Sequence, residues 1–281
     1  MRISSQPSPG RRGPRLVAGL AAVVLSMPAM AAAQYGAPEL GAAVPAEQYH
    51  VEVSGTLWNP DLSGIISSQR LGVLGSNVDF VDDLGFEQTR FKDVRIVLRP
   101  SRKSRFRIQY TPIQYQAETS LKRNIIFNGA TFPVNLPVQS EFDWKVWRFG
   151  YEYDVFYHER GFVGVLLEGR YTQMTAELAS PLITEITKVR APLPAIGVVG
   201  RAYPIPEVAI NFEMSMFRVP EEAIPDVEAN YYDWDIHGTI NLHPKVGLQV
   251  GWRRMTNFLV IDNDSADVKF QGLWFGGALR Y

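Results

Sequence analysis

Most of the chain alternates strictly between hydrophobic and polar residues. From Tyr49 onward, apolar side chains such as Val51 and Val53 alternate with polar ones such as Glu52 and Ser54. Successive side chains of a β-strand point to opposite faces, so this period of two predicts strands with one apolar and one polar face. The pattern recurs to the last residue, and an all-β fold is expected.

Ten segments carry the pattern, and the connections between them alternate between long and short. We place the predicted strands at 49–58, 88–99, 105–118, 138–155, 162–177, 195–203, 208–218, 231–242, 246–258 and 268–281. An even strand number with short turns at one end and long loops at the other is typical of outer-membrane barrels. The sequence therefore predicts a transmembrane antiparallel up-and-down β-barrel over residues 49–281. Ten strands fit best, and eight to twelve stay open because 121–127 and 131–137 could add a hairpin.

Alternation alone does not separate a barrel from a secreted soluble β-protein, which also has one buried face. Two further features favour the barrel: the polar face is crowded with charges of both signs, and the apolar face ends in aromatic residues. The predicted aromatic girdles consist of Tyr49, Tyr157 and Tyr281 at the short-turn end and of Tyr171, Tyr232, Trp252 and Phe258 at the other.

The N-terminal segment is typical of a secretory signal peptide. Arg2, Arg11, Arg12 and Arg15 precede a charge-free run over 16–33 that ends in small residues. We expect cleavage after Ala33, and an uncleaved anchor helix is the alternative. Residues 34–48 are rich in Ala, Gly and Pro and lack a period, so they are predicted to form a periplasmic N-terminal linker.

Composition narrows the function classes. The chain has no cysteine, which excludes disulfides, thiolate metal sites, cysteine catalysis and a lipoprotein anchor. Without the four arginines of the signal peptide, 24 basic and 29 acidic side chains are left, so no basic footprint for nucleic acid appears.

The whole mature segment resembles bacterial outer-membrane β-barrel proteins, and its last residues are similar to the C-terminal assembly signal of that class. That signal is carried here by Leu273, Phe275, Leu279 and Tyr281. The resemblance implies an outer-membrane location, contact with outer-membrane lipid, and recognition by the barrel-assembly machinery during biogenesis.

The inward polar face is expected to carry a charge cluster in the lumen. Its members are Glu52, Arg95, Arg107, Arg148, Glu152, Glu168, Arg170, Arg201, Glu213, Asp235, His237 and Arg253. A ten-stranded barrel is only slightly wider than one that side chains fill, so these long residues should meet as ion pairs. We expect a largely plugged lumen that passes at most small solutes, with a narrow open conduit as the alternative.

Asp235 and His237 stand two apart and therefore share a face, an arrangement that can build a general base. Omptin proteases, ten-stranded outer-membrane enzymes, use an Asp and a His two apart with an acidic pair, to which Asp82 and Asp83 are superficially similar. A surface hydrolase, omptin-like or lipid-modifying, is thus the alternative function. The residues around Asp235 do not reproduce omptin signatures, and a role in ion pairing is the preferred interpretation.

No other chemistry is indicated. The histidines lack partners at metal-ligand spacing, and the serine-hydrolase elbow, the P-loop and the dinucleotide fingerprint are absent, so neither a metal nor a cofactor is expected. The predicted loop 59–87 could gate the lumen, cover the external mouth or bind a protein partner at the surface. We expect a non-enzymatic membrane barrel, porin-like or structural.

Overall fold

The computed structural model describes residues 45–68, 74–219, 227–261 and 264–281. The expected signal peptide and most of the expected linker lie outside them. None of the described residues forms a helix with the length and apolar character needed to cross a membrane. The elements are η5 (Pro45–Glu47), β1 (Val51–Trp58), β2 (Asp61–Ser67), β3 (Val78–Asp79), β4 (Phe91–Leu98), β5 (Ser104–Ser120), β6 (Ile125–Phe127), β7 (Ala130–Phe132), β8 (Pro137–His158), β9 (Gly161–Ala179), β10 (Thr184–Ile205), β11 (Val208–Val219), β12 (Val227–His243), β13 (Val246–Ile261) and β14 (Asp264–Arg280).

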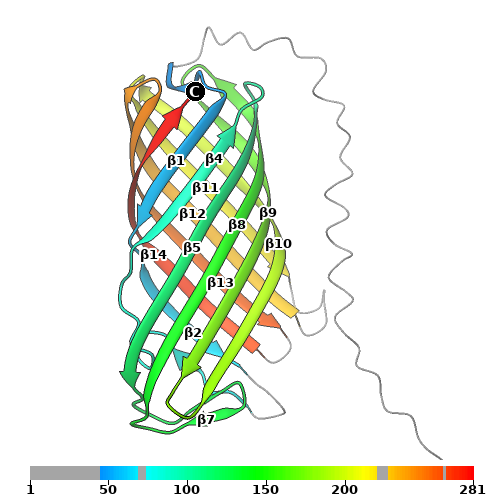
Figure 1. Ribbon diagram of the computed structural model, residues 1–281. Coiled ribbons are helices and arrows are strands. Elements are labelled where there is room, and N and C mark those ends of the chain that lie inside the picture. The colour runs from blue at the N-terminus through cyan, green and yellow to red at the C-terminus, as the bar shows by residue number, and fades with distance from the viewer. Residues whose placement is uncertain (1–44, 69–73, 220–226, 262–263) are drawn as a thin grey trace, which may run out of the picture. The chain divides into compact units, whose positions relative to one another are not determined.

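Ten strand positions close into an antiparallel barrel. Each strand pairs with its neighbour in the order β1, β4, β5, β8, β9, β10, β11, β12, β13, β14, and pairing of β1 with β14 closes the ring. Figure 1 shows these strands side by side around the barrel. The predicted up-and-down fold is confirmed. β6 and β7 pair only with each other, so the extra hairpin stands outside the barrel wall.

The first strand position is longer than the sequence indicates. β1 and β2 pair with β14 in one continuous register, with Trp58 opposite Trp274 and Asp61 opposite Gln271. The strand assignment breaks only at 59–60, where Pro60 lacks a backbone N–H. The prediction of a loop over 59–87 is therefore wrong in its first part, because residues 61–67 belong to the wall.

The start of β10 was also misplaced, since the strand begins at Thr184 and not at 195. Two prolines, Pro192 and Pro194, obscured the pattern. Ser180 donates its backbone N–H to the carbonyl of Ile183. Hydrogen-bonded positions alternate along an antiparallel pair, so the odd-numbered residues of β10 make the backbone hydrogen bonds to β9. Both prolines are even-numbered, and their nitrogens face away from β9, where β11 pairs only from Ile196 onward. Proline is tolerated at such an edge because no ladder bond is lost.

The two ends of the barrel differ, and we call them the short-turn end and the long-loop end. The short-turn end holds the C-terminus and the turns at 99–103, 159–160, 206–207 and 244–245, whereas the β6–β7 hairpin lies at the opposite end (Figure 1). The Tyr281 carbonyl accepts the N–H groups of His50 and Val51 there. The long-loop end holds the segments 74–90 and 121–136.

The residue types on the inward and outward faces exchange along the strands. In the part of β8 nearer the short-turn end, Phe149 faces outward and is 51% exposed, while Arg148 faces inward and is 3% exposed. Nearer the long-loop end, Trp144 is buried and its neighbour Lys145 is exposed. The barrel is thus apolar outside and charged inside in one half, and polar outside and apolar inside in the other.

Candidate functional site: the lumen of the barrel

All twelve residues of the predicted charge cluster lie on inward faces of the strands. Arg95 and Arg201 are partly exposed, and the others are buried. Each makes a hydrogen bond or ion pair with another inward residue. The contacts are arranged in three levels, described here from the short-turn mouth toward the middle of the barrel.

The first level centres on Glu47, in the short 3-10 turn η5 before β1. Its Oε2 lies 2.8 Å from Arg99 and 3.4 Å from Arg105, and its Oε1 lies 2.5 Å from Arg201. Tyr203 donates its hydroxyl to Oε1 at 2.7 Å. Four donors from β5, β10 and the end of β4 therefore converge on one carboxylate.

The charge of Glu47 is held in place by these donors. Burial alone would raise the pKa of the Glu47 carboxyl, but Arg201, Arg105 and Arg99 outweigh burial and hold that pKa well below its usual range. Burial, together with Glu52 and Glu47, raises the pKa of the nearby Tyr49 hydroxyl. Glu47 is therefore a carboxylate at any physiological pH.

The second level joins Glu152 and Glu213 through Arg107, and each glutamate has a further arginine partner. Glu152 lies 2.6 Å from Arg105 and 3.3 Å from Arg107. Arg107 also reaches Glu213 at 2.5 Å, and Arg95 reaches the other oxygen of Glu213 at 3.2 Å. These links cross the lumen, because β4 and β5 carry the arginines while β11 carries Glu213.

The third level is built around Arg148. Its guanidinium lies 3.0 Å from Glu168, 3.0 Å from Asp233 and 3.2 Å from Glu213. Arg253 adds a second guanidinium to Asp233 at 2.7 Å. The charges of opposite sign compensate each other inside the barrel, as buried ions require.

Aromatic rings mark the transition to the long-loop half. The guanidinium of Arg170, which also pairs with Glu168, lies 3.7 Å from the ring centre of Tyr231. Arg253 lies 5.0 Å from the ring centre of Trp58 in the same manner. Each arginine thus presents one face to carboxylates and the other to an aromatic ring.

Asp235 and His237 are in contact, as their spacing on β12 predicts. The His237 Nδ1 lies 2.5 Å from an Asp235 oxygen, and the Trp274 indole N–H donates to the other oxygen at 2.5 Å. The imidazole packs against the Trp274 ring with 5.0 Å between ring centres. The pair is buried within the lumen.

Asp82 and Asp83 are superficially similar to the acidic pair of omptins, but they lie in a different part of the barrel from Asp235 and His237. Asp83 pairs with Arg123 at 2.6 Å and accepts the backbone N–H of Asp79, while Asp82 is exposed. Both residues lie in the segment between β3 and β4 at the long-loop end. The structure records no contact between them and Asp235 or His237.

The long-loop half is filled by a hydrophobic core. The side chains come from inward positions of the wall strands and from the segments 74–90 and 121–136. Phe80 lies 4.8 Å from Phe142 between ring centres, and Tyr115 contacts both Phe86 and Phe91 at 5.6 Å and 5.2 Å. Fully buried members include Trp58, Phe80, Ile113, Tyr115, Leu121, Ile125, Phe132, Phe142 and Phe270.

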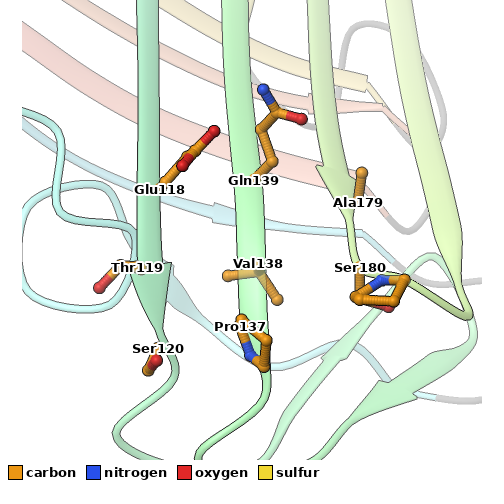
Figure 2. A pocket seen from close by; sticks show the side chains of 9 residues that line it. Glu118, Thr119, Ser120, Pro137, Val138, Gln139, Ala179 and Ser180 are labelled. Atoms are coloured by element: carbon orange, nitrogen blue, oxygen red, sulfur yellow. The ribbon is translucent and has the colours of Figure 1, made fainter.

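Two cavities lie outside the charge cluster, and neither gathers the charged groups that the lumen does. A shallow depression of about 630 Å³ lies at the long-loop ends of β5, β8 and β9, and Figure 2 shows Glu118 and Gln139 on its surface. An apolar recess lies between Met174, Val189 and Leu259. Within the described part of the chain, no three His, Asp or Glu side chains gather as a metal site would require.

Sequence reasoning missed several residues of the lumen. Asp93 shares the inward face of β4 with Arg95, and alternation would have found it. Glu47 gave no signal because it lies in a segment without periodicity. Tyr49 was wrongly assigned to an aromatic girdle, since it is 3% exposed and its ring lies beneath Arg99 and Arg280 inside the mouth.

No protein-family model and no curated protein matches the sequence. Among solved structures, the outer membrane protease OmpT from Escherichia coli matches with a TM-score of 0.51 and 9% identity over 83% of this chain and 97% of that chain. Ail, the attachment invasion locus protein of Yersinia pestis, matches with a TM-score of 0.36 and 9% identity over 83% and 99%. The Pseudomonas putida toluene transporter TodX matches with a TM-score of 0.35 and 7% identity over 83% and 90%.

These neighbours are outer-membrane β-barrel proteins, and of these three only OmpT exceeds a TM-score of 0.5. At 9% identity the match shows the fold alone. The chain therefore has the fold of an outer-membrane β-barrel protein.

Proposed function

We propose that the chain is an integral outer-membrane barrel with a closed lumen, which serves a structural role or displays its loops and passes at most very small solutes. The observation that carries this proposal is the filling of the lumen in both halves. Three levels of ion pairs occupy the short-turn half, and an aromatic core occupies the long-loop half. A pore would have to break one set of contacts in each half.

The inversion of alternation supports a membrane boundary in the middle of the barrel. On β8, outward residues from Trp147 to Val155 are apolar over about nine residues, the length with which a tilted strand crosses the hydrocarbon layer. Trp147, Tyr171 and Pro192 stand opposite one another on three adjacent strands. This row corresponds to an aromatic girdle at the membrane interface.

A row of cations follows on the long-loop side of that girdle. Lys145 on β8 and Arg190 on β10 both stand opposite Gln173 on β9, and both cations are exposed. On the other side of the barrel, Arg254 stands opposite Trp234 and two residues beyond Trp252. Basic residues next to a membrane surface favour anionic headgroups. We therefore orient the long-loop end toward the cell exterior and the short-turn end toward the periplasm.

The C-terminal strand supports the proposed recognition by the barrel-assembly machinery. Leu273, Phe275 and Leu279 lie on the outward face of β14, Tyr281 follows directly after the strand, and all four are exposed. This face would contact outer-membrane lipid after insertion. Replacing Tyr281 with Ser is expected to reduce the amount of assembled barrel in the outer membrane, and unchanged levels would contradict this role.

Planar-bilayer conductance tests the closed lumen. The purified barrel should show no large and stable open state, and any current should correspond to small ions. Arg148→Ala should raise conductance if the ion pairs obstruct the path, whereas Arg160→Ala in an exposed short turn provides the matched control. A large, stable conductance of the unmodified barrel would replace the closed picture with a general porin role.

Cell fractionation tests the location independently of conductance. The mature protein should fractionate with the outer membrane, and its electrophoretic migration after detergent extraction should change on heating. A soluble periplasmic protein would contradict the proposed location. Cleavage of the signal peptide after Ala33 is checked by the N-terminal sequence of the mature chain.

A surface hydrolase is the second candidate, and the observation that favours it is the 2.5 Å contact between Asp235 and His237. The same contact serves a structural role when the pair is buried beside ion pairs, because the Trp274 N–H occupies the second carboxylate oxygen. Under the barrel proposal, His237→Ala has no catalytic phenotype. Proteolytic or lipid-deacylating activity that disappears in both His237→Ala and Asp235→Asn would establish the enzyme.

A further inference from the structure

The short-turn mouth contains a set of arginines that is organised independently of the carboxylate it holds. Arg99 lies over the rings of Tyr49 and Tyr157, with 5.4 Å and 5.9 Å to the ring centres. Arg105 and Arg201 lie over the Phe162 ring at 4.0 Å and 5.6 Å. Aromatic rings thus contact all three guanidinium groups in addition to their anion.

Polar contacts add to this organisation. Arg99 donates to the Arg102 carbonyl at 3.0 Å, and Arg201 donates to the Asn211 side chain at 2.5 Å. Arg105 keeps Glu152 and Asp154 as partners. The three arginines would therefore stay in place if Glu47 were absent.

The carboxylate in the centre comes from a different kind of element. Glu47 belongs to the 3-10 turn η5 and not to a wall strand, so its position does not depend on the β-ladder. It is the only carboxylate within 4 Å of Arg99 or Arg201 among the described residues. The Nε atoms of Arg99 and Arg105 are buried without a hydrogen-bond acceptor in the described structure, so Glu47 does not use all the donors of the site.

We infer that Arg99, Arg105 and Arg201, with the Tyr203 hydroxyl, form a carboxylate-binding site at the short-turn mouth, and that Glu47 is its tethered and replaceable ligand. The two oxygens of one planar carboxylate match the observed division of donors, with Arg201 and Tyr203 on one oxygen and Arg99 and Arg105 on the other. A molecule that presents a carboxylate from the periplasmic side would bind by displacing Glu47.

The covalent attachment of Glu47 to the chain decides which ligands can compete with it for the three arginines. A tethered group has an effective concentration on the order of millimolar. A single free carboxylate at low concentration therefore cannot displace Glu47, whereas a ligand with several carboxylates can. Removing Glu47 exposes the site to simple carboxylates, and this makes the inference testable with acetate.

The experiment uses the full mature chain folded in detergent, with thermal unfolding followed by heat-modifiable migration. Glu47→Ala removes a group the size of acetate and should lower the unfolding temperature by about 5 °C, because Arg99 and Arg201 lose their carboxylate. Sodium acetate should restore the temperature in a saturable manner, while sodium chloride at equal ionic strength should not. The unmodified protein should not respond to acetate.

Three controls keep the test sharp. Glu159→Ala, in an exposed short turn, should show neither the loss nor the acetate response. Glu47→Gln should lose stability without rescue, because the amide still fills the site. Tyr203→Phe in the Glu47→Ala background should weaken the acetate response about tenfold, the effect of losing one hydrogen bond to a charged group.

Equal effects of acetate and chloride on Glu47→Ala, or an equal acetate response in the unmodified protein, would overturn the inference. If Glu47→Ala does not fold, its refolding yield with and without acetate replaces the unfolding temperature, and a yield that acetate does not raise would also overturn it. Conductance plays no part in this readout, so the carboxylate site and the closed lumen can fail separately.

Discussion

The two halves of the lumen solve the same packing problem with opposite chemistry. In the short-turn half, inward positions hold arginines and acids joined in ion pairs, such as Arg148 with Glu168 and Asp233. In the long-loop half, inward positions of the same strands hold aromatic and aliphatic side chains, such as Trp144 and Phe142 on β8. One continuous strand therefore changes from one type of interior to the other.

The difference follows from what surrounds each half. Where the outward face meets lipid it must be apolar, and polar residues of the strand are then confined to the interior. Where the outward face meets water it can be polar, and the interior becomes an ordinary hydrophobic core. The medium outside the wall thus selects the chemistry inside it.

The largest expected effect is in the charged half. Arg148→Met removes the guanidinium shared by three carboxylates and leaves them without compensation, so we expect a loss of about 3–5 kcal/mol in the free energy of unfolding. Denaturant unfolding in detergent measures it. Arg160→Met in an exposed turn is the control, and equal losses in both variants would remove the distinction between the halves.

The apolar half should respond to volume. Phe142→Ala deletes a fully buried ring that contacts Phe80 and Trp144, and a loss of about 3 kcal/mol is expected from the cavity. Phe142→Leu should lose much less. Hydrogen exchange should locate the loosening in segment 78–86. Protection there that is unchanged in Phe142→Ala would mean that this segment does not depend on the core.

A smaller effect is expected at the boundary between the halves. Lys145→Gln combined with Arg190→Gln removes two exposed cations beside the girdle, and binding to vesicles that contain anionic lipid should fall by about thirtyfold, at roughly 1 kcal/mol for each charge. Binding to neutral vesicles should not change. Lys245→Gln, in a short turn, is the control and should change binding to neither kind of vesicle. A loss of binding to anionic vesicles equal to that of the double variant would contradict the assigned orientation.

The smallest effect concerns pH at the long-loop end. Arg123 lowers the pKa of Asp83 through a hydrogen bond and its charge, against the opposing effect of burial. The pairing therefore contributes stability above the ordinary Asp pKa near 3.8, and the contribution is lost as pH falls through the lowered value. Arg123 is half exposed, so less than about 1 kcal/mol is at stake. The protection factors of the amides in segment 78–86, which correct for the intrinsic pH dependence of exchange, should be lower at pH 3 than at pH 6, and this difference should be absent in Asp83→Asn.

Much of the fold could be predicted from the sequence because alternation is a local property. The period of two located ten strands and assigned Arg148, Glu168 and Glu213 to one face. Strand ends were predicted less well, since Pro60, Pro192 and Pro194 interrupt the pattern although the wall continues through or beside them. The inversion in β8 is also written in the sequence, where Phe142, Trp144 and Val146 precede Trp147 and Phe149, and it could have located the apolar half.

The sequence by itself determined the up-and-down strand pattern, with ten strands as the best fit among eight to twelve, the direction of the charged face and the short turns, because each depends on residues close together in the chain. Only the tertiary structure decided which charges meet, because ion pairs such as Arg107 with Glu213 join distant strands across the lumen. It also placed Glu47 among three arginines. A segment without periodicity has no local signal. Its position is set by contacts at the mouth, where Ala46 packs against Tyr203 and Ala209 and Glu47 pairs with arginines that barrel closure brings together.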